Sequence, residues 1–217
     1  MMPTSKQSIR ENGLEFFVDV HEGHKTGFYL DQREGRLCVS ELAKNKKVLN
    51  CFAYTGAFSI YAAHGGAKEI VTVETSEAAL ALAKENVKAN GLDLEKFRFE
   101  KADVFEFLRA GKETYDLIVL DPPAFAPTQS SVMQASRGYK DINRLALMRL
   151  APGGLLFTYS CSHHVSPDLF QKIVFAAAKD ANVRARILEK TGHPVDHPIS
   201  IYHPEGEYLK GLLLLKS

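Results

Sequence analysis

Regular alternation of strand-like and helix-like stretches is the feature that most constrains the fold of this chain. Short apolar runs alternate with amphipathic segments from Lys46 to Ala181. Such alternation implies right-handed crossover connections and a mostly parallel sheet with helices on both faces. Residues 115–120 are apolar at almost every position, which is typical of an interior parallel strand. We therefore predict an α/β fold with a Rossmann-like sheet.

The bounds of the expected elements follow from periodicity and from start and stop residues. We expect strands at residues 14–20, 48–52, 69–74, 97–101, 115–120 and 155–159, and a closing antiparallel hairpin of residues 186–189 with 208–216. We expect helices at residues 55–64 (capped by Tyr54 or Thr55), 76–90 (capped by Thr75 or Ser76), 104–110, 141–150 and 167–181. Residues 1–10 are expected to be a loose lead-in, residues 23–36 a second extended element, and residues 126–140 a polar loop.

The length of 217 residues suits one domain with a small appendage. We predict an N-terminal β-hairpin extension over residues 1–45 and a main domain over residues 46–217. No apolar run is long enough to span a membrane, and residues 1–13 lack the apolar core of a secretory signal. We therefore expect a cytoplasmic protein.

The charge and the cysteine count exclude some classes of protein. The net charge of +1 does not indicate an obvious polyanion binder, although a basic face can coexist with an acidic one. Three cysteines without a CxxC pair indicate neither a disulfide framework nor a zinc ribbon. The histidine spacings fit no recognised ligand motif, so we expect no metal.

Polar residues at the ends of the first predicted parallel strands indicate a nucleoside site, because ligands of open α/β sheets bind there. A carboxylate at Glu74 can accept hydrogen bonds from both ribose hydroxyls. Asp103 can accept one from an adenine amino group, with Val104 beside the ring. Only Gly56 stands in the first turn and GxGxxG is absent, which favours S-adenosylmethionine over a nicotinamide dinucleotide. The alternative is that Glu74 and Asp103 are solvated strand-end acids.

Two later strand ends indicate chemistry on a flat nucleobase. Asp121 can bind the ring nitrogen and exocyclic amine, Pro122 and Pro123 stiffen the turn, and Phe125 can stack on the base. Cys161 at the next strand end can attack the base, since a thiolate is nucleophilic and can also leave. The alternative for Cys161 is a small buried hydrophobe.

Charged residues near these two strand ends suggest how the RNA is bound and how the thiol is activated. Arg137 and Lys140 follow the base-binding motif, and we interpret them as a flexible arm that binds RNA phosphates; a charged helix start explains them equally well. His163, His164 or the charge of the cofactor would lower the pKa of the Cys161 thiol. The sequence does not assign the base that would remove the proton from carbon 5 of a pyrimidine after methyl transfer.

Several segments together resemble class I S-adenosylmethionine-dependent methyltransferases. More narrowly, they resemble the bacterial 23S ribosomal RNA cytosine-C5 methyltransferases of the large-subunit methyltransferase I type. The matching segments are Gly23-His24-Lys25-Thr26-Gly27-Phe28-Tyr29-Leu30-Asp31-Gln32-Arg33, Val48-Leu49-Asn50-Cys51-Phe52-Ala53-Tyr54-Thr55-Gly56, Asp121-Pro122-Pro123-Ala124-Phe125, Arg137-Gly138-Tyr139-Lys140-Asp141-Ile142-Asn143, Ser160-Cys161-Ser162 and Tyr208-Leu209-Lys210-Gly211.

The resemblance implies a seven-stranded class I methyltransferase fold and S-adenosylmethionine as the cofactor. Together with the strand-end argument it assigns to the cofactor Phe28, Asp31, Gln32, Arg33, Asn50, Phe52, Tyr54, Thr55, Gly56, Glu74, Ser76, Asp103, Val104 and Asp121. Members of the family usually carry an N-terminal RNA-binding PUA domain, for which this chain has no room, so we expect a shortened homologue or a fragment. They tend to form dimers, so the resemblance also implies a homodimer.

Three functions follow as hypotheses. The first is formation of 5-methylcytosine in ribosomal RNA through a covalent adduct of Cys161. The second is nitrogen methylation of guanine in ribosomal RNA, for which the motif at Asp121 needs no cysteine. The third is a non-catalytic RNA-binding or assembly protein that keeps the cofactor fold.

Overall fold

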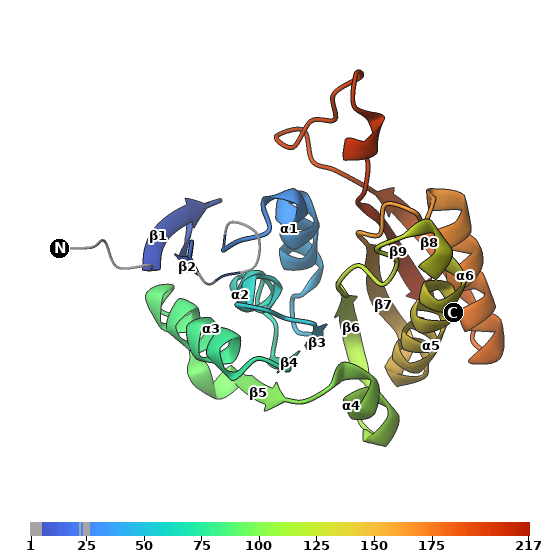
Figure 1. The fold of residues 1–217 in the computed structure, drawn as a ribbon. Coiled ribbons are helices and arrows are strands. Elements are labelled where there is room, and N and C mark those ends of the chain that lie inside the picture. The colour runs from blue at the N-terminus through green and yellow to red at the C-terminus, as the bar shows by residue number, and fades with distance from the viewer. Residues whose placement is uncertain (1–5, 22, 24–26) are drawn as a thin grey trace. The chain divides into compact units, whose positions relative to one another are not determined.

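The computed structural model describes residues 6–21, 23 and 27–217 (Figure 1). Within these residues the strands are β1 (Lys6–Glu11), β2 (Leu14–Asp19), β3 (Lys47–Cys51), β4 (Glu69–Glu74), β5 (Phe97–Lys101), β6 (Tyr115–Leu120), β7 (Leu150–Ser160), β8 (Ala185–Thr191) and β9 (Lys210–Lys216). The α-helices are α1 (Arg33–Leu42), α2 (Ala57–His64), α3 (Glu77–Ala89), α4 (Val104–Ala110), α5 (Val132–Arg149) and α6 (Pro167–Asp180). Short 3-10 turns are η1 (Leu30–Gln32), η2 (Leu94–Lys96), η3 (Gln129–Ser131) and η4 (Pro204–Gly206).

Seven strands form one mostly parallel sheet in the order β5-β4-β3-β6-β7-β9-β8, and β1 and β2 form a separate antiparallel pair. This is the predicted α/β architecture, with an antiparallel end and an N-terminal hairpin. The chain divides into two compact units, residues 1–101 and residues 102–217. The predicted division into residues 1–45 and 46–217 stays a prediction.

In the first unit, β3, β4 and β5 are parallel, with Cys51 opposite Val73 and Glu74 opposite Lys101. The N-terminal hairpin packs on α3, where two asparagine side chains replace the missing strand partner of β2. Asn90 Oδ1 accepts the backbone N–H of Glu15 at 2.8 Å, and Asn86 Oδ1 accepts that of Phe17 at 2.6 Å. These bonds cover an edge that would otherwise expose unpaired donors.

A buried ion pair joins the hairpin to the helices of the same unit. Arg36 donates to both carboxylate oxygens of Glu11, at 2.8 and 2.7 Å. The phenol of Tyr61 donates to Glu11 Oε1 at 2.9 Å, and Arg36 also donates to the backbone carbonyl of Tyr29. The guanidinium lies 4.6 Å from the centroid of the Phe28 ring. Hydrogen bonds therefore satisfy both charges of this buried pair, as buried charges require.

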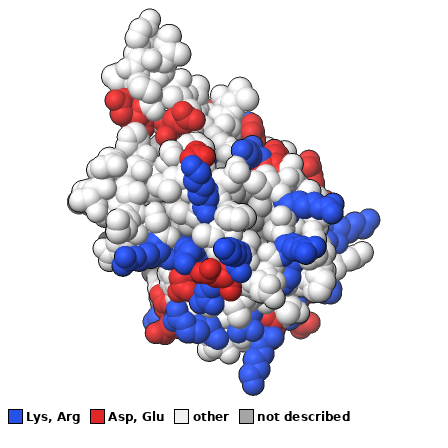
Figure 2. All heavy atoms as spheres, turned by 90° about the vertical axis from the view of Figure 1, so that its right-hand side faces the viewer, with Lys and Arg blue, Asp and Glu red and all other residues white. Residues whose placement is uncertain are grey.

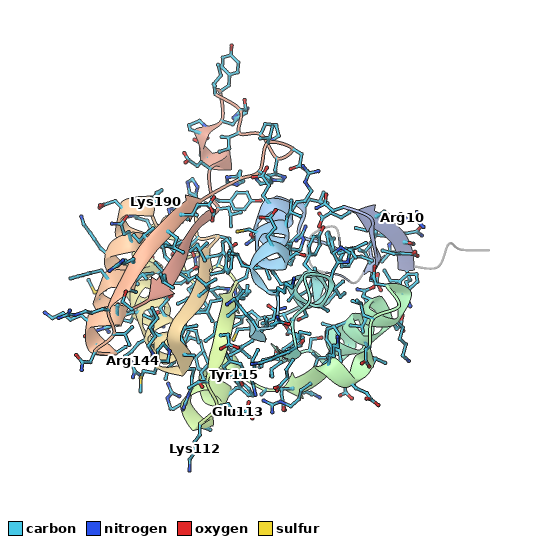
Figure 3. The ribbon with its side chains drawn as sticks, turned by 180° about the vertical axis from the view of Figure 1, so that it is seen from behind. Arg10, Lys112, Glu113, Tyr115, Arg144 and Lys190 are labelled. Carbon is cyan, nitrogen blue, oxygen red and sulfur yellow. The ribbon has the colours of Figure 1, made fainter. Side chains whose placement is uncertain are left out.

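In the second unit, β6 and β7 are parallel, and β7-β9-β8 continue as antiparallel neighbours. Helices α5 and α6 pack side by side against this part of the sheet (Figure 1). Figure 3 labels Glu113 and Tyr115 at the start of β6, where the phenol donates to the carboxylate at 3.1 Å. The register places Leu120 opposite Thr158, so Asp121 and Cys161 follow the carboxyl ends of adjacent strands.

An arm of residues 192–209 connects β8 to β9 and projects from the antiparallel end of the sheet (Figure 1). It contains no lysine or arginine, and Val195, Ile201 and Tyr202 are exposed on it. Figure 2 shows Lys and Arg below the arm, interspersed with acidic side chains. Several of these cations belong to ion pairs, such as Lys140 with Asp180, so the face is not continuously basic.

Four expectations about local structure were wrong. Lys6–Glu11, most of it expected as lead-in, is strand β1, and helix α1 starts at Arg33, inside the stretch expected to be extended. Helix α5 begins at Val132, so most of the expected polar loop is helical. The N-cap of α2 is Gly56 rather than Tyr54 or Thr55. Residues 1–5 of the lead-in, and residues 24–26 of the extended element and of the matching segment, lie outside the described residues.

The strands expected at 69–74, 97–101 and 115–120 and the helix expected at 104–110 are confirmed with the same bounds, and the closing hairpin forms between β8 and β9. Ser76 caps α3 as predicted, by accepting the backbone N–H of Ala79 at 3.2 Å. None of the helices in the described part of the chain is both long and apolar enough to cross a membrane.

Candidate active site

The turn after β3 has an unusual backbone conformation. Phe52, Tyr54 and Gly56 have positive φ angles of 56°, 47° and 79°. For the two aromatic residues this conformation costs about 1–3 kcal/mol each, and such strain concentrates at functional sites. Gly56 also has a packing role, because a Cβ there would lie 2.9 Å from Cβ of Ala83 on α3. The glycine in this turn was expected from the sequence, whereas the backbone strain at the two aromatic residues was not.

The carboxylate of Glu74 is held in one orientation by this turn and by the start of α3. The backbone N–H of Tyr54 donates to Oε2 at 2.9 Å. The backbone N–H groups of Thr75 and Ser76 donate to Oε1 at 2.8 and 3.0 Å. A carboxylate oxygen has two lone pairs, so Oε2 keeps capacity for a further donor such as a ribose hydroxyl.

Buried polar atoms in the first unit fit a polar ligand. Asn50 is 1% exposed, and its Nδ2 donates to Ser59 Oγ at 2.9 Å. Asn50 Oδ1 and Nε2 of buried Gln32 have no hydrogen-bond partner among the described residues. Buried polar atoms without partners are rare in native proteins and need an explanation. Together with Glu74, they give the first unit both donor and acceptor groups for a nucleoside cofactor.

The other predicted cofactor residues have varied surroundings. Phe28 is buried against Phe16, with ring centroids 5.0 Å apart, so it belongs to the core of the hairpin. Asp31 is buried beside Gln32, whereas Arg33 is half-buried at the start of α1. The backbone carbonyl of buried Thr55 accepts from Asn86 Nδ2 at 3.2 Å.

In the second unit, Asp103 caps α4 by accepting the backbone N–H of Glu106 at 3.0 Å, and Val104 is buried behind it. A structural role for Asp103 is therefore present, and binding of adenine stays a prediction.

The base-binding motif is anchored in the second unit by aromatic packing. Asp121 and Phe125 are half-buried, Pro122 is buried and Pro123 is exposed. The Phe125 ring lies 4.6 Å from that of Tyr139 and 6.2 Å from that of Phe105. Phe125 is thus held by aromatic packing while it remains half-buried, and stacking on a base stays a prediction.

The loop after β7 is hydrogen-bonded to this motif. The thiol of Cys161 donates to the backbone carbonyl of Pro122, with Sγ and O 3.7 Å apart. Ser162 Oγ accepts the backbone N–H of Ala126 at 3.1 Å and lies 2.8 Å from the phenol oxygen of Tyr139. The predicted nucleophile and the predicted base-binding turn therefore touch each other.

Tyr139 is a residue to which the sequence alone gives no role beyond its place in a segment that resembles the methyltransferase family. Its ring is fully buried, and burial raises the pKa of its phenol, so the group is neutral at physiological pH. From α5 it supports both Phe125 and Ser162. Tyr139 is therefore the residue that connects the two loops of this half of the site.

Replacing Tyr139 by phenylalanine is expected to lower the free energy of unfolding by about 1–2 kcal/mol, because a buried hydrogen bond is lost while the ring packing remains. Chemical denaturation of both proteins measures this difference. Tyr202→Phe is the matched control, since Tyr202 is 83% exposed. An equal effect of the two substitutions would contradict the connecting role of Tyr139.

Arg137 and Lys140 lie on α5 rather than on a flexible arm, which corrects the expectation. Lys140 donates to Asp180 at 2.8 Å, so its positive charge is partly neutralised by an ion pair within the fold. Arg137 is exposed and remains a candidate for binding phosphate. Across the described residues, no group of three or more His, Cys, Asp or Glu side chains is arranged to hold a metal ion.

Comparison with known proteins identifies relatives of the whole chain. A family model described as S-adenosylmethionine-dependent methyltransferase matches residues 2–203. Ribosomal RNA large subunit methyltransferase I of Aeromonas salmonicida is 53% identical over 98% of this chain and 54% of its own length. The corresponding protein of Tolumonas auensis is 52% identical over 98% of this chain and 55% of its own length. The chain thus spans about half the length of the curated relatives it matches.

Among solved structures, a methyltransferase complexed with SAH is 29% identical and superposes with a TM-score of 0.88, over 99% of this chain and 57% of that chain. The fold and the bound SAH in that relative agree with the cofactor expected from the strand ends.

Proposed function

Because this chain belongs to the S-adenosylmethionine-dependent methyltransferase family, we propose that it forms 5-methylcytosine in ribosomal RNA through a covalent adduct of Cys161. The observation that carries the proposal is the contact of the Cys161 thiol with the Pro122 carbonyl. That contact joins a nucleophile to a turn whose acid, prolines and aromatic ring suit a flat base. The relatives named above are ribosomal RNA large subunit methyltransferases, which supports this substrate class. A ribosomal RNA substrate also agrees with action in the cytoplasm.

We assign the cofactor to the strained turn and to the polar groups around it. Glu74 Oε2 would accept from a ribose hydroxyl, and Asn50 and Gln32 would supply the polar atoms that have no partner among the described residues. The predicted contributions of Phe52, Tyr54 and the other cofactor residues remain part of this assignment. When bound, S-adenosylmethionine supplies an electrophilic methyl group.

The residues of the second unit would activate the cytosine. Carbon 5 is a poor nucleophile until the Cys161 thiolate adds to carbon 6, which makes carbon 5 an enamine carbon. Asp121, in its protonated form, would donate to the ring nitrogen and accept from the exocyclic amine, which stabilises the negative charge that develops on attack. Carbon 5 then takes the methyl group, after which its proton leaves to a base and the bond from carbon 6 to Sγ breaks. The net result is one methyl group transferred and one proton released.

The test is transfer of labelled methyl from S-adenosylmethionine into ribosomal RNA that lacks the modification, followed by digestion to nucleosides and chromatography. The proposal predicts label in 5-methylcytidine. Label in a methylguanosine would contradict the covalent mechanism and would favour the nitrogen methylation that the motif at Asp121 could also support.

Replacing Glu74 by glutamine is expected to weaken binding of S-adenosylmethionine about tenfold or more, because hydrogen bonds to a charged acceptor contribute roughly 1.5–3 kcal/mol. Calorimetry measures the dissociation constant directly. Glu69→Gln is the matched control, since Glu69 begins the same strand and pairs with Lys47. Unchanged affinity in Glu74→Gln would remove Glu74 from the cofactor site.

A further inference from the structure

A buried ammonium group lies against the loop that carries Cys161. Lys210 is the first residue of β9, pairs with Ser160 in the sheet register, and is 7% exposed. Its Nζ donates to the backbone carbonyls of Ser162 and Val165, both at 2.6 Å. Ser162 directly follows Cys161 and Val165 lies further along the same loop, so Lys210 fixes the loop that begins at the nucleophile.

The ammonium group of Lys210 lies next to both chain neighbours of Cys161, because Lys210 pairs with Ser160 in the sheet and its Nζ donates to the carbonyl of Ser162. Burial lowers the pKa of Lys210 to about 8, against opposing interactions with Cys161 and Glu207 that raise it. At neutral pH most of the side chain is therefore still protonated. Interactions between ionisable groups are reciprocal, so an ammonium that a thiolate stabilises must also stabilise that thiolate.

Among the described residues, three other groups near Cys161 carry no positive charge. The Pro122 carbonyl accepts the thiol proton and so favours the neutral thiol. Tyr139, which packs from α5, is neutral, and Asp121, which follows the end of the adjacent strand, adds no positive charge.

His163 and His164 lie on the same loop as Cys161. His163 is exposed and His164 half-buried, and their rings are 5.2 Å apart. An exposed imidazole is screened by water and acts on a neighbouring charge less than a buried ammonium does. Lys210 is therefore the cation whose surroundings suit it to act on the thiol.

We propose that Lys210 is a positioning residue that holds the loop after β7 and favours the thiolate form of Cys161. The inference rests on the proposed function, because it presumes that Cys161 is the nucleophile. It differs from the earlier expectation that His163, His164 or the cofactor activates the thiol. It also concerns ionisation of the thiol alone, which is measurable without RNA.

The experiment is the rate of Cys161 alkylation by iodoacetamide as a function of pH, followed by mass spectrometry of the peptide that contains Cys161. The wild-type midpoint is expected below the ordinary cysteine pKa of about 8.5. Lys210→Met should raise the midpoint by about one pH unit or more, since an opposite charge nearby shifts a pKa by that amount. Lys210→Arg keeps the charge and should leave the midpoint closer to that of the wild type.

Lys216→Met is the matched control, because Lys216 ends the same strand and donates to two backbone carbonyls, those of Leu147 and Leu150. It should leave the Cys161 midpoint unchanged. The proposal is overturned if Lys210→Met does not move the midpoint or if Lys216→Met moves it equally. If Lys210→Met fails to fold, a wild-type midpoint at or above the ordinary value overturns it.

The outcomes separate this inference from the proposed function. A low Cys161 midpoint that depends on Lys210, found together with no 5-methylcytidine, would contradict the function and leave the role of Lys210 intact. If 5-methylcytidine forms but the Cys161 midpoint does not depend on Lys210, the function is supported and the role of Lys210 is contradicted.

Discussion

Replacing Cys161 by alanine is expected to lower the rate of 5-methylcytidine formation by roughly four orders of magnitude or more, as loss of a covalent nucleophile does in other enzymes. Without the thiolate, carbon 6 receives no nucleophile and carbon 5 stays unreactive. The measurement is the single-turnover rate with ribosomal RNA at a saturating concentration of S-adenosylmethionine. Binding of S-adenosylmethionine should be unchanged, because the expected loss is confined to the chemical step.

Cys38→Ala is the matched control, since Cys38 is also half-buried but lies on α1 in the other unit. It should retain the wild-type rate. A Cys161→Ala protein that keeps its rate within about tenfold of the wild type would contradict the covalent mechanism. Asp121 and Phe125 would then be the working site for a reaction that needs no nucleophile.

Replacing Arg36 by methionine is expected to lower the free energy of unfolding by about 3–5 kcal/mol, because the Glu11 carboxylate would remain buried without its partner. Glu11 is 8% exposed and Arg36 is 1% exposed, so water cannot readily replace the lost bonds. Chemical denaturation measures the difference. Cofactor affinity should fall as well, since Gln32 precedes α1 directly and depends on the position of this helix.

Two variants serve as controls for Arg36→Met. Lys172→Met breaks an exposed ion pair with Asp168 and should change the free energy of unfolding by about 0.5 kcal/mol or less. Combining Arg36→Met with Glu11→Gln removes both charges and should recover part of the loss. Similar costs for Arg36→Met and Lys172→Met would mean that the buried pair does not hold the hairpin to the helices.

The hydrophobic pattern correctly predicted the elements that are buried on one face or on both faces. Residues 69–74 and 115–120 are apolar runs between turn residues, and a parallel interior strand is the structure that buries such a run. Strand β1 was not predicted because residues 6–11 are mostly polar and exposed, and they form a strand by pairing with β2. This pairing depends on tertiary structure, which the local sequence pattern does not reveal.

The starts of α1 and α5 were predicted wrongly for a different reason. Neither helix has a side-chain N-cap hydrogen bond, and α5 contains Gly138. Cap residues are the strongest local signal for a helix start, so their absence moved the expected bounds. Gly138 packs closely on Phe125, because a Cβ there would lie 3.3 Å from the ring.

The candidate site was predictable at the level of strand ends and not at the level of supporting groups. Glu74 ends a predicted strand and Asp121 and Cys161 lie just after two others, so topology alone locates them. Lys210 and Tyr139 act through contacts between elements far apart in the sequence. The left-handed conformation of Phe52 and Tyr54 has no local signal either, since aromatic residues rarely adopt it.

The central claim is that Cys161 bonds covalently to carbon 6 of a cytosine. It is tested most directly with RNA in which 5-fluorocytidine replaces cytidine, because fluorine at carbon 5 cannot leave as the proton does and the adduct persists. With S-adenosylmethionine present, the account predicts a denaturant-stable protein–RNA complex whose linkage maps to Cys161 and is absent in Cys161→Ala. Formation of 5-methylcytidine on normal RNA without any trapped complex, or a complex that survives Cys161→Ala, would contradict it.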